Sequence, residues 1–270
     1  MSNSHSRKLL PEGSSLRFKD FSMIVNIARK ELKSLFSSPM GWVILALLQF
    51  VFATFYLMSV DQYFLTMSGA MRPDQRIGVT EFVGGSVFGI APFIMLFAVP
   101  LLSMRLISEE RRQQTLPFLF SAPLSLTEIV LGKFVGLLSF LSVSVLLIGA
   151  MVFSLNLWAD IDFGFLFANL LGLFLLLASY CALGTYVSST TQQPVVAAII
   201  TFVALLALQL IEYFLAGDPS NTVANLSLMR HFEPLSRGML DTRDIAYFLL
   251  FIITFLTLTI RRLDADRLRG

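Results

Sequence analysis

The residues best suited to chemistry form one short cluster, Ser108–Glu109–Glu110–Arg111–Arg112, which lies between two long apolar runs. A pair of glutamates beside a membrane suggests metal-assisted hydrolysis, which in intramembrane metalloproteases also needs an arginine further along and separate histidines. Here Gln114 stands at the position of that arginine, and the only histidines, His5 and His231, lie outside the apolar runs. A histidine-bearing metal site is therefore not expected.

ATP chemistry is not expected in this chain alone, because it has no Gly-x-x-x-x-Gly-Lys-Ser/Thr phosphate loop. Gly132–Lys133 is followed by Phe134 and opens an apolar run. The single cysteine, Cys181, lies inside another apolar run, which excludes a disulfide framework. We therefore expect neither a catalytic residue nor a bound cofactor or metal.

The elements that position the charged cluster are membrane-spanning helices. The chain is 56% hydrophobic and 14% charged, with a mean hydropathy of +0.75, whereas a soluble domain carries about 25% charged residues. A spanning helix needs about 20 mostly apolar residues. Six runs satisfy this need: 41–60, 86–107, 129–155, 163–187, 194–215 and 245–260. The sequence thus predicts an all-α integral membrane protein with a transmembrane domain over 38–260.

The distribution of basic residues predicts the orientation of the spans. With six spans both termini lie on one side, and this side holds 15 of the 20 Lys and Arg residues. By the positive-inside rule it is cytoplasmic. The polar and basic first forty residues contain no compact apolar core followed by a cleavage site, so no cleavable signal peptide is expected. Because membrane topology accounts for the positions of the basic residues, they give no reason to expect binding to nucleic acid. The cytoplasmic parts are the polar N-terminus 1–19, the loop 108–128 and the basic tail 261–270, and the external segments are 61–85 and 216–244.

Residues 20–37 predict a different kind of helix, one that lies along the membrane surface. Ile24, Ala28 and Leu32 fall on one face of this helix, and the other face is polar and includes charged residues. These charged residues are Arg29, Lys30, Glu31 and Lys33. Such an amphipathic helix binds membrane lipid at the interface, and Ser38–Pro39 then begins the first span.

Several features of the spans leave two readings open. Gly85-x-x-x-Gly89 and Gly132-x-x-x-Gly136 allow close approach of helices, either within the chain or between subunits. Pro92 and Pro100 predict either tolerated kinks or a flexible joint. Lys133 lies near a cytoplasmic end, where its side chain can extend to the interface.

Two motifs add a resemblance to a known family. The first comprises Glu109, Glu110, Arg111, Arg112, Thr115, Leu116, Leu119, Ala122–Ser125 and Ile129–Lys133. The second comprises His231, Phe232, Glu233, Ser236, Arg237, Gly238, Asp241, Arg243, Asp244, Tyr247 and Phe248. Together with the organisation of the spans, they resemble the permease subunit of type-2 ABC exporters, and the second motif is similar to the gliding-motility branch. The first motif departs from the family pattern at two positions. Gln114 replaces the usual glycine, and Pro117 replaces an acidic residue.

The resemblance implies a bacterial inner (cytoplasmic) membrane as the location and a division of labour between subunits. The 108–125 region would act as a coupling helix for a dimer of separate ABC ATPase subunits, which would hold the ATP and magnesium. A second permease subunit, identical or homologous, would complete the pathway. The alternative is a non-transporting membrane component that transmits ATPase motion to an accessory periplasmic or membrane partner. A channel or secondary carrier is a third reading, weakened by the lack of carboxylates near the middle of the spans.

Overall fold

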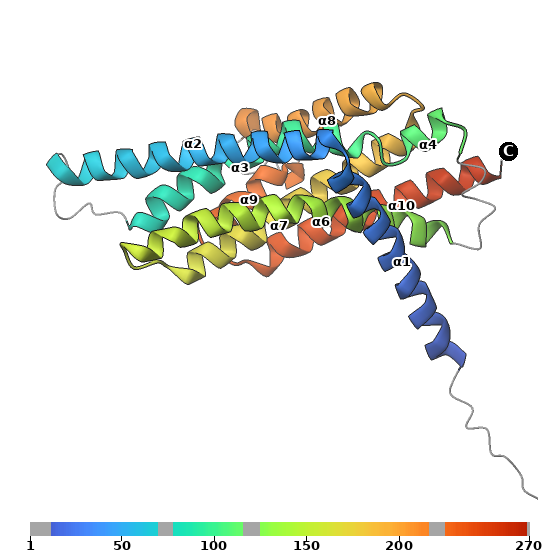
Figure 1. Ribbon diagram of the computed structural model, residues 1–270, viewed down its shortest axis with the longest axis horizontal. Coiled ribbons are helices and arrows are strands. Elements are labelled where there is room, and N and C mark those ends of the chain that lie inside the picture. Colours follow the sequence, from blue (N-terminus) through green and yellow to red (C-terminus); the bar gives the residue numbers. More distant parts are fainter. Residues whose placement is uncertain (1–11, 70–77, 116–124, 216–224, 269–270) are drawn as a thin grey trace, which may run out of the picture.

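The computed structural model describes residues 12–69, 78–115, 125–215 and 225–268, and every regular element within these ranges is a helix (Figure 1). The prediction of an all-α protein is therefore confirmed. In chain order the elements are α1 (Glu12–Ser37), α2 (Pro39–Gly69), the π-helical turn η2 (Thr80–Gly84), α3 (Gly85–Ser103), α4 (Ser108–Arg112), α6 (Leu126–Phe153), the 3-10 turn η3 (Ser154–Leu157), α7 (Phe163–Thr190), α8 (Pro194–Leu215), α9 (Leu228–Ser236) and α10 (Thr242–Arg267).

Six helical stretches are long and apolar enough to cross a membrane, which confirms the predicted number. They are Pro39–Met67, Thr80–Arg112, Leu126–Leu157, Phe163–Thr190, Pro194–Ile211 and Thr242–Arg267. Figure 1 shows α4 and the C-terminal end of α10 at one end of the bundle, and the far ends of α2 and α6 at the other.

Helix α7 forms the centre of the bundle. In its most apolar stretch 78% of the residues are buried, whereas the corresponding value for α10 is 22%. Helices α3, α6, α8 and α10 all pack against α7. Fully buried aromatic rings fill the spaces between the spans: Phe52, Phe88, Phe140, Tyr180 and Phe248. The outer helices keep apolar side chains on the surface, as a lipid environment allows.

Side-chain caps set where several helices begin. At α6 the Ser125 hydroxyl accepts a hydrogen bond from the Glu128 backbone N–H at 3.2 Å, and the Glu128 carboxylate accepts one from the Ser125 N–H at 2.7 Å. This reciprocal pair satisfies two backbone donors that the helix cannot. Helices α7, α9 and α10 have simpler N-caps, in which only a side-chain oxygen of the cap residue accepts from the backbone. The cap residues are Asp162, Ser227 and Asp241, respectively.

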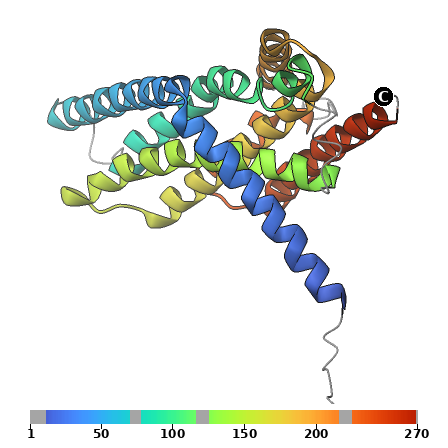
Figure 2. The same cartoon turned by 45° about the vertical axis from the view of Figure 1, so that its right-hand side comes forward.

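A sharp corner joins α1 to α2, because only Ser38 separates them. A Cβ atom on Gly41 would lie 2.3 Å from the Leu35 carbonyl oxygen, so no larger residue fits there. The Trp42 Nε1–H donates to the Phe36 carbonyl oxygen at 2.7 Å, which satisfies one carbonyl at the end of α1. Helix α1 therefore leaves the bundle at a steep angle (Figures 1 and 2).

Candidate coupling site

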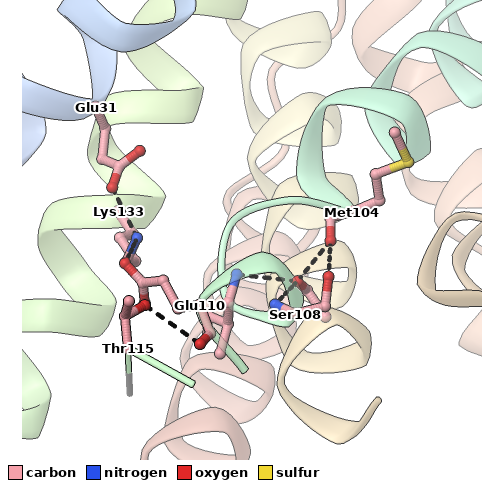
Figure 3. Close-up of polar contacts among 8 residues, drawn as sticks. Glu31, Met104, Ser108, Glu110, Thr115 and Lys133 are labelled. Carbon is pink, nitrogen blue, oxygen red and sulfur yellow. Dashed lines mark hydrogen bonds and ion pairs between the residues drawn. The ribbon is translucent and has the colours of Figure 1, made fainter. Parts of the chain in front are cut away.

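The C-terminal end of the second span is broken into α3 and α4, and hydrogen bonds to Ser188 of α7 hold the two helices at the break. Its hydroxyl oxygen accepts hydrogen bonds from the Ile107 and Ser108 N–H groups, both at 3.1 Å, and donates to the Met104 carbonyl oxygen at 3.0 Å (Figure 3). The Ser108 hydroxyl also donates to this carbonyl. Ser188 thus uses its full hydrogen-bonding capacity, and α4 starts at a position set by the central helix.

Helix α4 ends in a Schellman motif, in which one residue turns into the left-handed region. The Thr115 N–H donates to the Glu110 carbonyl oxygen at 3.0 Å, and the Gln114 N–H donates to the Arg111 carbonyl oxygen at 3.1 Å. Gln114 has φ +56°, and among the described residues it is the only non-glycine residue with a positive φ. The resemblance placed a glycine at this position, and its backbone conformation explains that preference physically.

The strained end of α4 can be tested by changing Gln114. We expect Gln114→Val to disturb the Schellman motif, because a β-branched side chain resists the left-handed region more than glutamine does. Gln114→Gly should keep the turn and change the free energy of unfolding by no more than about 1 kcal/mol. Hydrogen exchange of the Thr115 amide measures the effect, and equal protection in both variants would contradict it.

A three-way ion pair joins α4 to α1 and α6. The Lys133 Nζ atom of α6 lies 2.7 Å from Glu31 Oε1 of α1 and 2.8 Å from Glu110 Oε1 of α4 (Figure 3). The Lys133 side chain is only 5% exposed, and those of Glu31 and Glu110 are 21% and 27% exposed. Lys133 therefore ends between two carboxylates instead of extending to solvent. Charge-assisted hydrogen bonds of this kind are stronger than neutral ones.

Two glycines make the approach of α1 to α6 possible. A Cβ atom on Gly132 would lie 2.6 Å from the Ile27 side chain, and one on Gly136 would lie 2.7 Å from Glu31 Cβ and 3.0 Å from the Ala28 carbonyl oxygen. The motif Gly132-x-x-x-Gly136 thus serves packing within the chain. Gly89, the second glycine of the other motif, would meet nothing within 4 Å.

The remaining predicted cytoplasmic residues divide between the two sides of α4. Glu109 is 42% exposed and lies 3.9 Å from Arg105, and Arg112 and Thr115 are exposed. Arg112 lines a hollow together with Gln192 and Gln193. Arg111 instead turns inward and pairs with Asp266 of α10. Two other predicted residues, Leu116 and Leu119, lie outside the described residues.

The predicted surface helix corresponds to the C-terminal part of α1. Arg29, Lys30 and Lys33 are exposed, whereas Glu31 turns towards Lys133. Ala28, from the predicted apolar face, is buried and contacts Gly136. This face therefore packs partly on α6.

The second motif forms the junction of α9 and α10. Phe232 is fully buried, and the Ser236 hydroxyl donates to the Glu233 carbonyl oxygen at 2.8 Å. On the surface Glu233 pairs with Arg237 at 2.5 Å. Gly238 has φ +82°, as the turn requires, and the Asp241 carboxylate accepts from the Arg243 N–H at 2.9 Å to begin α10.

A buried polar group completes this junction. His231 Nδ1 lies 2.7 Å from the Asp244 carboxylate, and Nε2 lies 3.2 Å from the Asn225 carbonyl oxygen. The imidazole ring stacks on Tyr247 with the ring centres 3.9 Å apart, and the Tyr247 hydroxyl donates to the Leu226 carbonyl oxygen at 2.7 Å. His231 Nδ1 thus joins α9 to α10, and Nε2 joins α9 to the segment before it.

The sequence did not indicate the inward-facing partners of α4. Ser188 and Asp266 lie far from the cluster in sequence, and nothing in their local pattern marks them. Lys133 belonged to a motif, but its two carboxylate partners depend on how α1 packs on Gly132 and Gly136. Contacts between distant segments of this kind carry no local signal.

Comparison with known families identifies the protein class. The chain matches the family model described as "ABC-2 family transporter protein" over residues 25–267. No curated protein matches it at a significant level. The matched range contains all six spans, α4 and each partner in the ion pairs described above, and the match does not single out the gliding-motility branch. The chain therefore belongs to the ABC-2 transporter family, as a multi-pass permease component of an ABC transporter.

Proposed function

We propose that this permease is driven by a separate ATPase dimer, that the ATPase docks on α4, and that the cycle moves a cargo across the membrane. The observation that supports this most directly is the two-sided arrangement of the charges on α4. Glu109 and Arg112 face outward, where a partner can reach them, while Glu110 and Arg111 face inward to other helices. A helix that only covered the surface would not need the inward set.

The inward contacts offer a path for movement. Glu110 connects α4 to α6 and α1 through Lys133, Arg111 connects it to α10, and Ser188 connects its first turn to α7. A push on α4 would therefore act on four helices together. In this proposal ATP-driven closure of the ATPase switches the spans between two packings, as in other bistable assemblies.

We place a second permease subunit, identical or homologous, against the face made by α2, α3 and α8. Two apolar hollows run along this face, one between α2 and α3 and one between α3 and α8, and they share Phe97 and Leu101 of α3. Pro92 and Pro100 remove backbone donors from the same helix. The grooved surface and the two prolines together favour α3 as the helix that moves and lines the transport pathway.

The proposed orientation places α4, the turn between α7 and α8 and the end of α10 in the cytoplasm of a bacterium. The positive-inside distribution supports it. The α9–α10 junction then lies outside, where it is available to an accessory periplasmic or membrane protein. ATP and magnesium belong to the ATPase in this arrangement.

The proposal is tested with the purified chain and with the complex it forms with its ATPase. We expect no ATP hydrolysis by the chain alone and magnesium-dependent hydrolysis by the complex. Since Cys181 is buried, spin labels can be attached selectively at Gln113→Cys and Gln62→Cys. In reconstituted vesicles the distance between these labels should change when ATP is added. Hydrolysis without any change in this distance would contradict the coupling role.

The outer charge of α4 gives a direct test of docking. We expect Glu109→Lys to leave membrane insertion and folding intact, because this side chain is well exposed, and to weaken ATPase binding about tenfold or more, because a partner surface made for a carboxylate would meet a cation. Glu110→Lys should instead disturb folding, since it places two cations beside each other at Lys133. Asp264→Lys makes the same charge change on an exposed cytoplasmic site and is the control. Equal binding by wild type and Glu109→Lys would exclude this contact.

A further inference from the structure

Two arginines converge on one carboxylate where α4 meets the end of α10. Arg111 pairs with Asp266, and their side chains are 12% and 19% exposed. A terminal nitrogen of Arg262 lies 3.8 Å from the other oxygen of Asp266, and the Arg262 side chain is 38% exposed. Arg262 is thus held loosely, with part of its guanidinium open to the surroundings.

This cluster carries a surplus positive charge. Two guanidinium groups face a single carboxylate, and the nearest carboxylates of α4 are engaged elsewhere, Glu109 with Arg105 and Glu110 with Lys133. Among the described residues, the Nε atoms of Arg111 and Arg262 have no hydrogen-bond partner, although both atoms are enclosed. A partly buried charge without full compensation is unfavourable, so the cluster is suited to bind an anion.

The position of the cluster indicates where that anion comes from. Helix α10 is the least covered span, and Leu258, one turn before Arg262 on the same face of the helix, is 38% exposed. Lipid acyl chains must therefore cover this surface. The stretch of α10 without charged residues ends at Ile260, two residues before Arg262, so Arg262 lies at the level of the lipid headgroups.

We propose that Arg262, backed by Arg111, binds the phosphate of an anionic phospholipid in the cytoplasmic leaflet. When the Arg262 side chain turns so that its enclosed Nε reaches the surface, Nε and a terminal nitrogen form the fork that binds phosphate oxygens in pairs. Arg261 and Arg267 are exposed on the same turns of α10. They disfavour a zwitterionic headgroup, whose own cation would lie among arginines. Basic pockets between spanning helices on the cytoplasmic side are known to hold anionic headgroups.

The experiment measures lipid binding to the purified full chain in detergent, by native mass spectrometry and by thermal unfolding. The probes are phosphatidylglycerol, phosphatidylcholine and inorganic phosphate. We expect phosphatidylglycerol to bind at least fivefold more tightly than phosphatidylcholine and to raise the unfolding temperature. Inorganic phosphate at the same concentration should do neither. If inorganic phosphate binds as well as phosphatidylglycerol, the site takes a free anion and the lipid proposal fails.

Three variants separate a specific site from a general surface charge. Arg262→Gln should reduce the preference for phosphatidylglycerol about tenfold, whereas Arg261→Gln, which removes an exposed neighbouring charge, should reduce it less than twofold. Asp266→Asn should increase it, because the competing carboxylate is lost. A purely structural role would lower stability in both Arg262→Gln and Asp266→Asn and leave the lipid preference unchanged. That result overturns the proposal, as does equal loss in Arg262→Gln and Arg261→Gln, or a loss of ATPase binding in Arg262→Gln without any effect on lipid.

Discussion

Replacing Lys133 by methionine should release both α1 and α4 from α6. The variant leaves two carboxylates, Glu31 and Glu110, facing each other without their shared cation at a site where all three side chains are largely buried. Removing one partner of a buried ion pair lowers the free energy of unfolding by about 3 kcal/mol. Hydrogen exchange of the complex should show lost protection in α1 and α4, with α7 unchanged.

A compensated variant separates the loss of folding from the loss of coupling. When Lys133→Met is combined with Glu31→Gln and Glu110→Gln, no uncompensated charge remains, and stability should largely return. Coupling of hydrolysis to the spans should stay low, since the charged connection between the helices is still absent. Lys30→Met is the matched control, because Lys30 is exposed on the same helix as Glu31. Full coupling in the triple variant would show that the ion pair serves stability alone.

The second large effect is expected from Gly136→Leu. A Cβ atom at this position would already lie 2.7 Å from Glu31 Cβ and 3.0 Å from the Ala28 carbonyl oxygen, and the latter is backbone that cannot rotate away. The whole of α1 must therefore shift outward, which lowers the free energy of unfolding by about 2 kcal/mol or more. The shift also pulls Glu31 away from Lys133. Protease cleavage within α1 and the distance from a label at Lys33→Cys to α6 both report it.

Gly89→Leu provides the control for that substitution. Gly89 occupies the second position of the other small-residue motif, but a Cβ atom there would meet nothing within 4 Å. The same addition of side-chain volume should leave α1 and the free energy of unfolding nearly unchanged. Similar losses in the two variants would mean that any leucine at a helical glycine disturbs the bundle and that close packing of α1 is not the cause.

The fold could be predicted from the sequence because its main features are local. Each span is a continuous apolar stretch, as lipid requires, so length and hydropathy alone give the number of spans. The charged cluster at Glu109–Arg112 cannot enter hydrocarbon, which placed it outside the bilayer. The N-caps and the proline at the start of α2 act within a single turn, and such signals can also be read directly.

The coupling site could be predicted only in part, because its contacts join distant segments. Four consecutive charges marked α4, but the alternation between outward Glu109 and inward Glu110 depends on how α4 is rotated. Ser188 of α7 fixes this rotation from 80 residues away along the chain. The left-handed backbone conformation of Gln114 could not be predicted from its residue type. Only the resemblance, in which a glycine is usual at this position, indicated it.

The braced corner at Ser38 makes α1 and α2 two arms of one lever. Helix α1 has 26 residues and α2 has 31, so the arms are about 39 Å and about 46 Å long at 1.5 Å per residue. Gly41 and Trp42 leave little freedom at the pivot. If the corner turns as a rigid unit, a displacement of about 4 Å at the far end of the α1 arm becomes a displacement of about 5 Å at the far end of α2. A movement of α1 would thus change the tilt of α2 and shift the far end of this span.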